Sequence, residues 1–399
     1  MSTAEFVDSI GVNTHLSSAA YASRFDLVHN LLQRSGIRHL RDELRPQNNV
    51  AHWQALFSDL GVRSHMLVSP TTNSISDLLD YIKILGIDRL SAIEGQNEGD
   101  SDWFMSQTGQ AGSWDKIVVD YQGAVYTALR AEYSAAQLPI LSPTVLDYKP
   151  EDFGKIRGAA EFCDLVAIHS YVQQAQEPET ADRMAGLAWY LNEFATPFKP
   201  DAPVMATETG YHNLTRRKGT GVSEKAAAAY IPRLLLHNFT AGIRRTFLYQ
   251  LLDGGADAAD AEHHYGLVRH DDTPKPAFDA VSTLVASFTS IQTSGSNRHD
   301  PGAVSLVTPT NGARIACFSN GDSCSIVAVW RPVKCWDAAS GTDIDVKPLR
   351  VRIVTTKPSR PTWIELGSGQ TWSEPVRALT AFEVPVGANA VLIKFEDID

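Results

Sequence analysis

The sequence predicts an α/β fold: a (β/α)8 TIM barrel over residues 1–290, followed by a smaller all-β antiparallel sandwich domain over residues 291–399. Two patterns support this division. As far as about residue 289, short apolar runs alternate with longer segments of helical periodicity, which is typical of repeated βα units. After about residue 290 the helical periodicity ends, and short alternating runs between turn residues indicate antiparallel strands.

Eight apolar runs are the candidate strands of the barrel. They occupy residues 9–16, 37–44, 62–69, 89–98, 138–145, 164–171, 203–210 and 244–252. The helical patterns between them include residues 24–35, 74–85, 115–134, 178–195 and 223–240. Several runs follow a glycine or a proline, as in the short loops that lead from a helix into the next parallel strand. Eight such units in about 280 residues match a closed parallel barrel. A doubly wound open sheet is disfavoured because no glycine-rich phosphate loop follows the first run.

The runs beyond residue 290 are shorter and alternate between apolar and polar residues. They lie at Ala303–Val307, Ala313–Phe318, Ser325–Trp330, Val351–Thr355, Thr362–Leu366 and Ala390–Phe395. Turn pairs such as Asn311-Gly312 and Ser340-Gly341 separate them. A β-sandwich of about 110 residues accommodates strands of this number and length.

The chain has four cysteines. Cys163 lies within an apolar run, so we expect a buried thiol there. The other three are Cys317, Cys324 and Cys335, and a disulfide between the first two would close a short turn. Zinc is disfavoured because these cysteines form no C-x-x-C pair and have no nearby histidine. We therefore favour free thiols at all four positions.

The composition argues against several classes of partner. The formal net charge is −11, which disfavours nucleic acid because a polyanion requires a basic surface. No run of about 18 apolar residues is present, so we expect no transmembrane helix and no membrane partner. The first residues lack the features of a signal peptide. We expect a cytoplasmic protein if Met1 is its natural first residue, and a secreted or periplasmic one if a signal peptide has been removed.

Polar and ionisable residues gather at the carboxyl ends of the predicted strands, which converge on one face of a parallel barrel. Two glutamates stand out, because Glu98 ends the fourth run and Glu208 lies near the end of the seventh. The other candidates in this set are His15, Arg41, Asn97, His169, Tyr171 and Tyr249. Burying so many polar groups without a function would cost on the order of several kcal/mol. A pair of carboxyl groups is the minimum equipment for cleaving a glycosidic bond.

Two loops complete the expected rim. The loop of residues 99–114 carries three aromatic residues, and these either stack on a sugar at the leaving-group side or pack as a hydrophobic lid. They are Trp103, Phe104 and Trp114. The acidic segment 253–265 has two histidines but no spaced set of metal ligands, so we expect a solvated flap. Glu94 lies inside the fourth run, and we expect it lower in the barrel than Glu98 or in a layer that packs against the helices.

The chain resembles clan A of the retaining glycoside hydrolases over roughly residues 9–290. Asn97-Glu98 is similar to the Asn-Glu pair of that clan, and Glu208, which is followed by Thr-Gly, is similar to its nucleophile strand. His169-Ser-Tyr171 is similar to the His-x-Tyr of the sixth strand in family five and its relatives, and Arg41 to an arginine of the second strand. The sandwich resembles an appendage common in families thirty-nine, thirty and seventy-nine. One departure is Tyr249, where family-five members usually carry a tryptophan.

The resemblance implies a retaining β-glycosidase in which Glu98 is the general acid/base and Glu208 is the nucleophile. Arg41 and the Tyr171 hydroxyl would keep Glu208 ionised, and the Asn97 amide would contact the sugar 2-hydroxyl. The expected substrate-binding residues are Arg41, Asn97, His169, Tyr171, Tyr249, His15 and Trp103. The expected partner is a carbohydrate, and we expect neither a metal nor another cofactor.

Two alternatives stay open. A metal-dependent amidohydrolase-type barrel is disfavoured, because it needs a His-x-His on the first strand and the chain has only His15 there. A non-catalytic carbohydrate-binding or exopolysaccharide-associated barrel would keep the fold without turnover, although both glutamates are intact. The sugar, the linkage, endo or exo action and the oligomeric state do not follow from these motifs.

Overall fold

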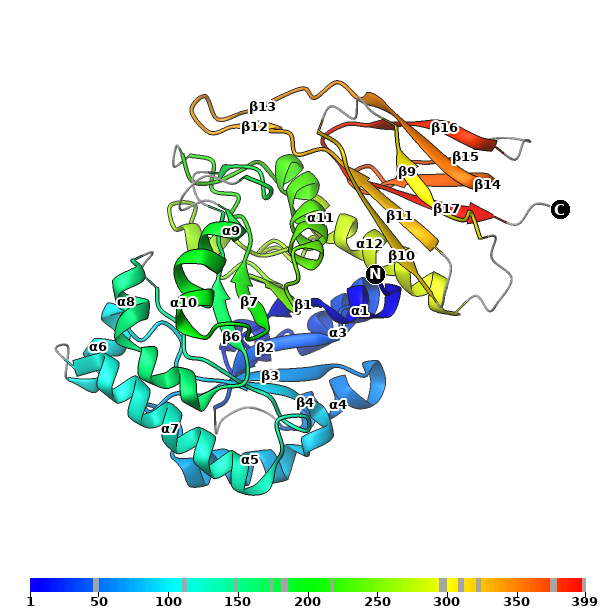
Figure 1. Cartoon of the computed structure of the whole chain (residues 1–399). Coiled ribbons are helices and arrows are strands. Elements are labelled where there is room, and N and C mark those ends of the chain that lie inside the picture. Colours follow the sequence, from blue (N-terminus) through cyan, green and yellow to red (C-terminus); the bar gives the residue numbers. More distant parts are fainter. Residues whose placement is uncertain are drawn as a thin grey trace.

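The computed structural model describes the chain except for residues 46–49, 110–112, 147–148, 173–174, 181–185, 217–218, 294–299, 308–311, 321–323, 374–378 and 397–399. Figure 1 shows a larger part, in which helices surround a central set of strands, and a smaller part built of strands. Two helices of the larger part lie next to the smaller part, so the two parts share a boundary rather than a long linker.

The larger part is a nearly closed barrel of eight parallel strands. The strands are β1 (Ile10–Asn13), β2 (His39–Glu43), β3 (Arg63–Leu67), β4 (Leu90–Glu94), β5 (Ile140–Leu141), β6 (Val166–His169), β7 (Val204–Thr209) and β8 (Arg245–Leu248). They are hydrogen-bonded in the order β5-β4-β3-β2-β1-β8-β7-β6, and a bridge between Leu141 and Leu165 joins the two outer strands. Each strand lies within one predicted run, so the predicted barrel is confirmed.

The helices cover the outside of the barrel (Figure 1). They are α1 (Thr3–Asp8), α2 (Ala19–Ala22), α3 (Phe25–Ser35), α4 (Val50–Leu60), α5 (Ile75–Leu85), α6 (Asp102–Thr108), α7 (Trp114–Glu132), α8 (Pro150–Lys155), α9 (Leu187–Tyr190), α10 (Thr196–Phe198), α11 (Glu224–Thr240) and α12 (Pro276–Thr293). Helix α5 shows how the sequence sets these bounds. Ser74 and Asp77 form a capping box at its start, and Gly86, with φ of 92°, follows its end.

The helix predicted over residues 178–195 is wrong at its start. Residues 178–179 form a turn, and the described helix begins at Leu187 and continues as a π-helical turn over Leu191–Ala195. Glu179 has a different role from a surface helix residue. It is fully buried and accepts two hydrogen bonds from Arg233 of α11, at 2.9 and 2.5 Å.

The smaller part is an antiparallel β-sandwich arranged around one long strand, β14 (Leu349–Glu365). The first half of β14 pairs with β16 (Leu379–Val386) and β9 (Val304–Leu306), and the second half pairs with β17 (Val391–Glu396) and β15 (Thr371–Ser373). Strands β11 (Cys324–Trp330) and β10 (Arg314–Ser319) extend the second layer. A separate hairpin is formed by β12 (Trp336–Asp337) and β13 (Thr342–Asp343). The predicted sandwich is confirmed, although the sequence analysis missed β12, β13, β15 and β16 and divided β14 into two runs.

Cys317 and Cys324 form a disulfide, so the prediction of free thiols is wrong at these two positions. The pairing of β10 with β11 is the physical reason. The two strands are antiparallel neighbours, and a register shift after Phe318 brings the two Cα atoms to 5.9 Å, within the usual range for a disulfide. Cys163 and Cys335 are free and buried, as predicted for Cys163.

Helix α1 packs the two parts together. Phe6 is fully buried, and its ring centroid lies 4.5 Å from that of Phe288 on α12 and 5.1 Å from that of Phe318 on β10. The Ser319 N–H also donates to the carbonyl of Met1 at 2.8 Å. The sandwich therefore shares a hydrophobic core with the helices of the barrel. Among the described residues, none of the helices has the length and apolarity that a membrane crossing requires.

Candidate active site

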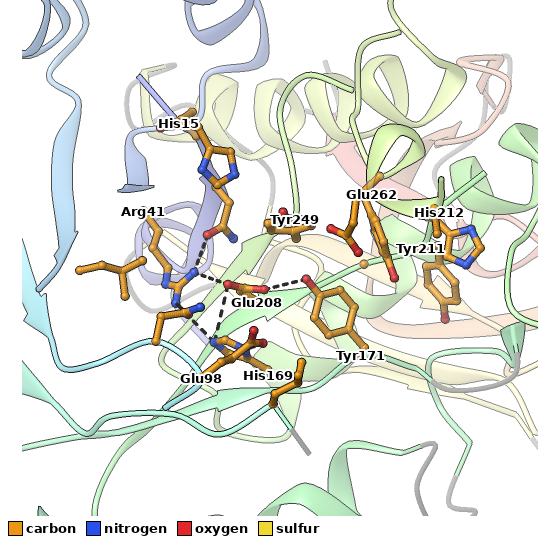
Figure 2. Close-up of a pocket in the computed structure, with 18 of the residues that line it drawn as sticks. His15, Arg41, Glu98, His169, Tyr171, Glu208, Tyr211, His212, Tyr249 and Glu262 are labelled. Carbon is orange, nitrogen blue, oxygen red and sulfur yellow. Dashed lines mark hydrogen bonds and ion pairs between the residues drawn. The ribbon is translucent and has the colours of Figure 1, made fainter. Parts of the chain in front are cut away.

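The carboxyl ends of the barrel strands surround a cavity of about 530 Å³. Figure 2 shows side chains from several barrel strands and loops pointing into it. Eight of the nine predicted site residues line this cavity: His15, Arg41, Asn97, Glu98, His169, Tyr171, Glu208 and Tyr249. The ninth, Trp103, lies outside it, in an adjoining cavity.

Glu208 lies near the carboxyl end of β7, and two partners hold its carboxylate. Arg41 Nη1 donates to Oε1 at 2.6 Å, and the Tyr171 hydroxyl donates to Oε2 at 2.8 Å. Burial alone would raise the pKa of Glu208, but the charges of His169 and Arg41, together with these hydrogen bonds, lower it below its ordinary value. Glu208 is therefore ionised at neutral pH, and both of its oxygens are oriented.

Arg41, on β2, is the centre of the network beneath the cavity (Figure 2). Its Nε and Nη2 donate to Glu94 at 2.9 and 2.8 Å. Its Nη1 also donates to Asn13 and its Nη2 to Asn97, both at 2.8 Å. With the bond to Glu208, these contacts match the five N–H groups of a guanidinium. Arg41 is thus fully engaged by protein partners.

Glu94, the last residue of β4, is fully buried below Arg41. Its second contact is with His65, whose Nε2 lies 2.7 Å from Oε2. Burial would raise the pKa of Glu94, but Arg41 and His65 hold it well below its usual range. The prediction that Glu94 lies lower in the barrel than Glu98 is confirmed, and its role is to support Arg41.

Glu98 lies in the loop after β4 and has a backbone φ of 45°, a left-handed conformation that few non-glycine residues adopt. Its N–H donates to the Thr144 hydroxyl at 3.1 Å, which holds the loop in place. One carboxylate oxygen of Glu98 lies 2.8 Å from Nδ1 of His169. Oxygens of Glu98 and Glu208 and a ring nitrogen of His169 all lie within 4.8 Å of one another. The two glutamates therefore face one space.

His169, at the end of β6, lies between the two glutamates. Its Nε2 is 3.8 Å from Oε1 of Glu208 and 3.3 Å from Nη2 of Arg41. Burial would lower the pKa of His169, but the charge of Glu208 and the contact with Glu98 raise it. The imidazole thus lies in contact with Glu98 and within 4 Å of Glu208, and it joins the two carboxyl groups in one network.

One wall of the cavity comes from residues that the sequence analysis did not select. Glu262, on the 3₁₀ turn Ala261–His264, and Tyr265 both line it. The ring centroid of Tyr265 lies 5.5 Å from that of Tyr249 and 5.6 Å from that of Tyr171. Glu262 is exposed, as predicted for a solvated flap over residues 253–265, but Tyr265 is partly buried against two tyrosines, so the prediction is wrong at Tyr265. The aromatic residue at its end was the one available sequence signal.

Asp42 and His15 line the same cavity. Asp42 accepts hydrogen bonds from the Thr14 hydroxyl at 2.7 Å and the Leu16 N–H at 2.9 Å. Burial nevertheless raises the pKa of Asp42 to about 7. Burial lowers the pKa of His15, whose ring lies 6.0 Å from that of Tyr249. His15 is therefore a neutral imidazole at neutral pH.

Trp103 lies in an adjoining cavity of about 450 Å³, which shares Asn97 and Glu98 with the first. Its side chain is 53% exposed and belongs to α6, so the segment predicted as a loop contains a helix. Phe104 and Trp114 are buried in the hydrophobic core. For these two residues the lid interpretation is confirmed, whereas the Trp103 indole faces solvent beside Glu98.

The spacing of Glu98, His169 and Glu208 would also allow the three side chains to bind a metal ion. Their present partners argue against such a site. Glu208 already accepts hydrogen bonds on both oxygens, and a cation there would face the Arg41 guanidinium. This arrangement suits carboxyl chemistry better than cation binding.

Neither a family model nor a curated protein matches the sequence. Solved structures do match. A family 39 glycoside hydrolase from Bacteroides cellulosilyticus aligns with 98% of this chain and 82% of its own chain, at a TM-score of 0.63 and 14% identity. A glucosidase from Croceicoccus marinus aligns with 93% of this chain and 92% of its own chain, at a TM-score of 0.59 and 9% identity. β-Glucuronidase 2 from Bacteroides uniformis aligns with 94% of this chain and 42% of its own chain, at a TM-score of 0.50 and 14% identity. This chain therefore has the fold of these glycoside hydrolases, as the sequence predicts.

Proposed function

We propose that the protein is a retaining β-glycoside hydrolase that cleaves an oligo- or polysaccharide through a covalent glycosyl-enzyme intermediate. One observation carries this proposal: oxygens of Glu98 and Glu208 lie within 4.8 Å of each other in one cavity. Retaining enzymes have carboxyl groups about 5–5.5 Å apart, too close for a water molecule to attack from between them. The fold that the chain shares with solved glycosidases supports the same assignment.

Glu208 is the nucleophile in this proposal. The lowered pKa keeps its carboxylate ionised, and Arg41 and Tyr171 orient the two oxygens. One oxygen attacks the anomeric carbon as the bond to the leaving oxygen breaks, so the glycosyl unit is transferred to Glu208. Water then attacks the same carbon and releases the carboxylate, and two displacements retain the configuration.

Glu98 is the general acid/base. It donates a proton to the leaving oxygen in the first step and removes one from water in the second. Its side chain is 21% exposed, against 11% for Glu208, so a leaving group and an incoming water can reach it. Asn97 is the neighbouring contact. Because its Oδ1 accepts from Arg41, its amide nitrogen is the group left to donate to the sugar 2-hydroxyl.

The test is covalent trapping with an activated glycosyl donor that carries fluorine in place of the 2-hydroxyl. Fluorine slows both displacements, and the activated leaving group speeds only the first, so the intermediate accumulates and we expect one glycosyl unit per chain, attached to Glu208. Intact mass and peptide mapping measure the label, and Glu208→Gln, the matched control, should stay unlabelled. A label on another residue overturns the assignment of the nucleophile. Sugar binding without a label across a panel of glycosyl types supports the non-catalytic alternative.

Trp103 provides a stacking surface for the leaving sugar in this proposal, because it lines the cavity that adjoins Glu98. We expect Trp103→Ala to lower kcat/KM about 3- to 10-fold for a β-linked oligosaccharide, the value of about 0.5–1.5 kcal/mol for an aromatic contact. Turnover of a dinitrophenyl glycoside should change little. The matched control is Trp372→Ala, an indole 37% exposed on β15. Equal losses on both substrates would contradict a role on the leaving-group side.

A further inference from the structure

We infer that the glycosyl unit bound at Glu208 is uncharged. Glu262 selects this unit by accepting hydrogen bonds from its hydroxyl groups and by repelling a carboxylate. This inference rests on the proposed function and names the substrate class of the same site. It excludes uronic acid units, the class that the name of one structural relative, a β-glucuronidase, implies for that protein.

Glu262 is placed to contact a bound sugar. It lines the cavity together with Glu98 and Glu208, and Figure 2 shows its carboxylate pointing into the cavity beside Tyr249. It interacts with the Tyr249 hydroxyl across this wall. Part of the Glu262 side chain is exposed to solvent, and burial of the rest together with the charge of Glu208 raises its pKa, as expected of two carboxyl groups that face the same cavity. A carboxyl group in such a place suits sugar hydroxyl groups, which donate hydrogen bonds to it.

The charges around the cavity disfavour an anionic sugar. The described lining residues include five carboxyl groups, Asp42, Glu43, Glu98, Glu208 and Glu262, against a single guanidinium. That guanidinium belongs to Arg41, which is buried and has its hydrogen bonds directed to protein partners. Arg45, which lines the adjoining cavity, already pairs with Glu43. Among the described residues that line this cavity, a uronate carboxylate would therefore meet like charges and no cation beyond Arg41, which costs affinity.

The described histidines of the cavity do not supply this charge either. Burial lowers the pKa of His15, so its ring is neutral at neutral pH. His169 lies against Glu98 and Glu208, which already balance any charge that it carries. His212 accepts a hydrogen bond from the Leu214 N–H on Nδ1, and a ring nitrogen that accepts carries no proton. The described side chains of the cavity are thus better suited to hydrogen bonds with sugar hydroxyl groups than to binding a carboxylate.

The experiment compares aryl β-glycosides in matched pairs that differ only in a hydroxymethyl or a carboxylate group: glucoside with glucuronide, and galactoside with galacturonide. At pH 7.5 we expect kcat/KM for the neutral member of the preferred pair to exceed that of the uronide by about 100-fold or more. In Glu262→Gln, which keeps the shape and removes the charge, the ratio should fall by about 10-fold. Asp257→Asn, the matched control, removes an exposed charge from the same segment and should leave the ratio unchanged.

Saturation-transfer NMR on the Glu208→Gln protein measures sugar binding without turnover. The probes are glucose compared with glucuronate, and galactose compared with galacturonate. Binding of the neutral sugars but not of the uronic acids supports the inference, whether or not the protein hydrolyses a glycoside. Absence of hydrolysis across the panel would instead contradict the proposed hydrolase activity. Hydrolysis or binding that favours the uronic acids overturns the inference and leaves the hydrolase standing. A ratio unchanged in Glu262→Gln removes Glu262 as the selecting group.

Discussion

The Glu98→Ala variant is expected to lose about 10²- to 10⁴-fold of kcat/KM toward a β-linked disaccharide, the range that a positioned general acid contributes. A sugar leaving group needs a proton as the bond breaks, and Glu98 is the more exposed of the two facing glutamates and lines the cavity that holds Trp103. A dinitrophenyl leaving group departs without that proton. Toward such a glycoside the first step should stay near the native rate, and steady-state kinetics with a pre-steady-state burst would show the slow second step.

Azide provides the diagnostic for Glu98→Ala. It is a nucleophile that needs no base, so it should attack the glycosyl-Glu208 intermediate from the side that Glu98 vacates and form a β-glycosyl azide. The expected readout is a rise in the turnover of the dinitrophenyl glycoside with azide concentration, with the product configuration read by NMR. Glu151→Ala, an exposed glutamate of α8, is the matched control and should show neither loss nor rescue. Native-like disaccharide hydrolysis by Glu98→Ala would remove Glu98 from the acid/base role.

The barrel and the two glutamates could be predicted because their signals are local. Each described strand of the barrel lies within one apolar run, and a parallel barrel brings the carboxyl ends of its strands to one face. This geometry is why Glu98 and Glu208 meet although 208 − 98 = 110 positions separate them. Glu94 was correctly placed lower in the barrel by its position inside a strand.

Contacts made by irregular segments could not be predicted in the same way. The segment that holds Glu262 has the acidic, glycine-rich and alanine-rich composition of a surface loop, and only the fold turns its carboxyl group into the cavity. Likewise, the Cys317–Cys324 disulfide depends on a register shift between two strands, which hydrophobic alternation does not specify. The position of His169 between both glutamates also follows from the curvature of the barrel rather than from its own neighbours in sequence.

Arg41→Met is the change with the largest expected effect on stability. Arg41 is 2% exposed and pairs with Glu94 and Glu208, so its loss leaves two buried carboxylates without their cation. Breaking a buried pair in this way costs about 3–5 kcal/mol of unfolding free energy. The shift of the urea midpoint measures it. Arg350→Met, at an exposed pair on β14 with a 3.7 Å separation, is the matched control and should change stability by less than about 0.5 kcal/mol.

The dependence of this loss on pH separates charge from packing. In the native protein the folded pKa of Glu94 is lowered, so its contribution to stability is present above its unfolded pKa of about 4.3 and is lost as the pH falls through the folded value. In Arg41→Met the burial of Glu94 remains while its main cation is gone, so its folded pKa should rise above the unfolded one. Stability of the variant should then fall as the pH rises, and the gap to the native protein should widen between pH 4 and pH 7. The double variant Arg41→Met/Glu94→Gln should lose part of this widening, because the buried charge is gone. A gap of constant size would mean that Arg41 stabilises the barrel by filling space and not by neutralising Glu94 and Glu208.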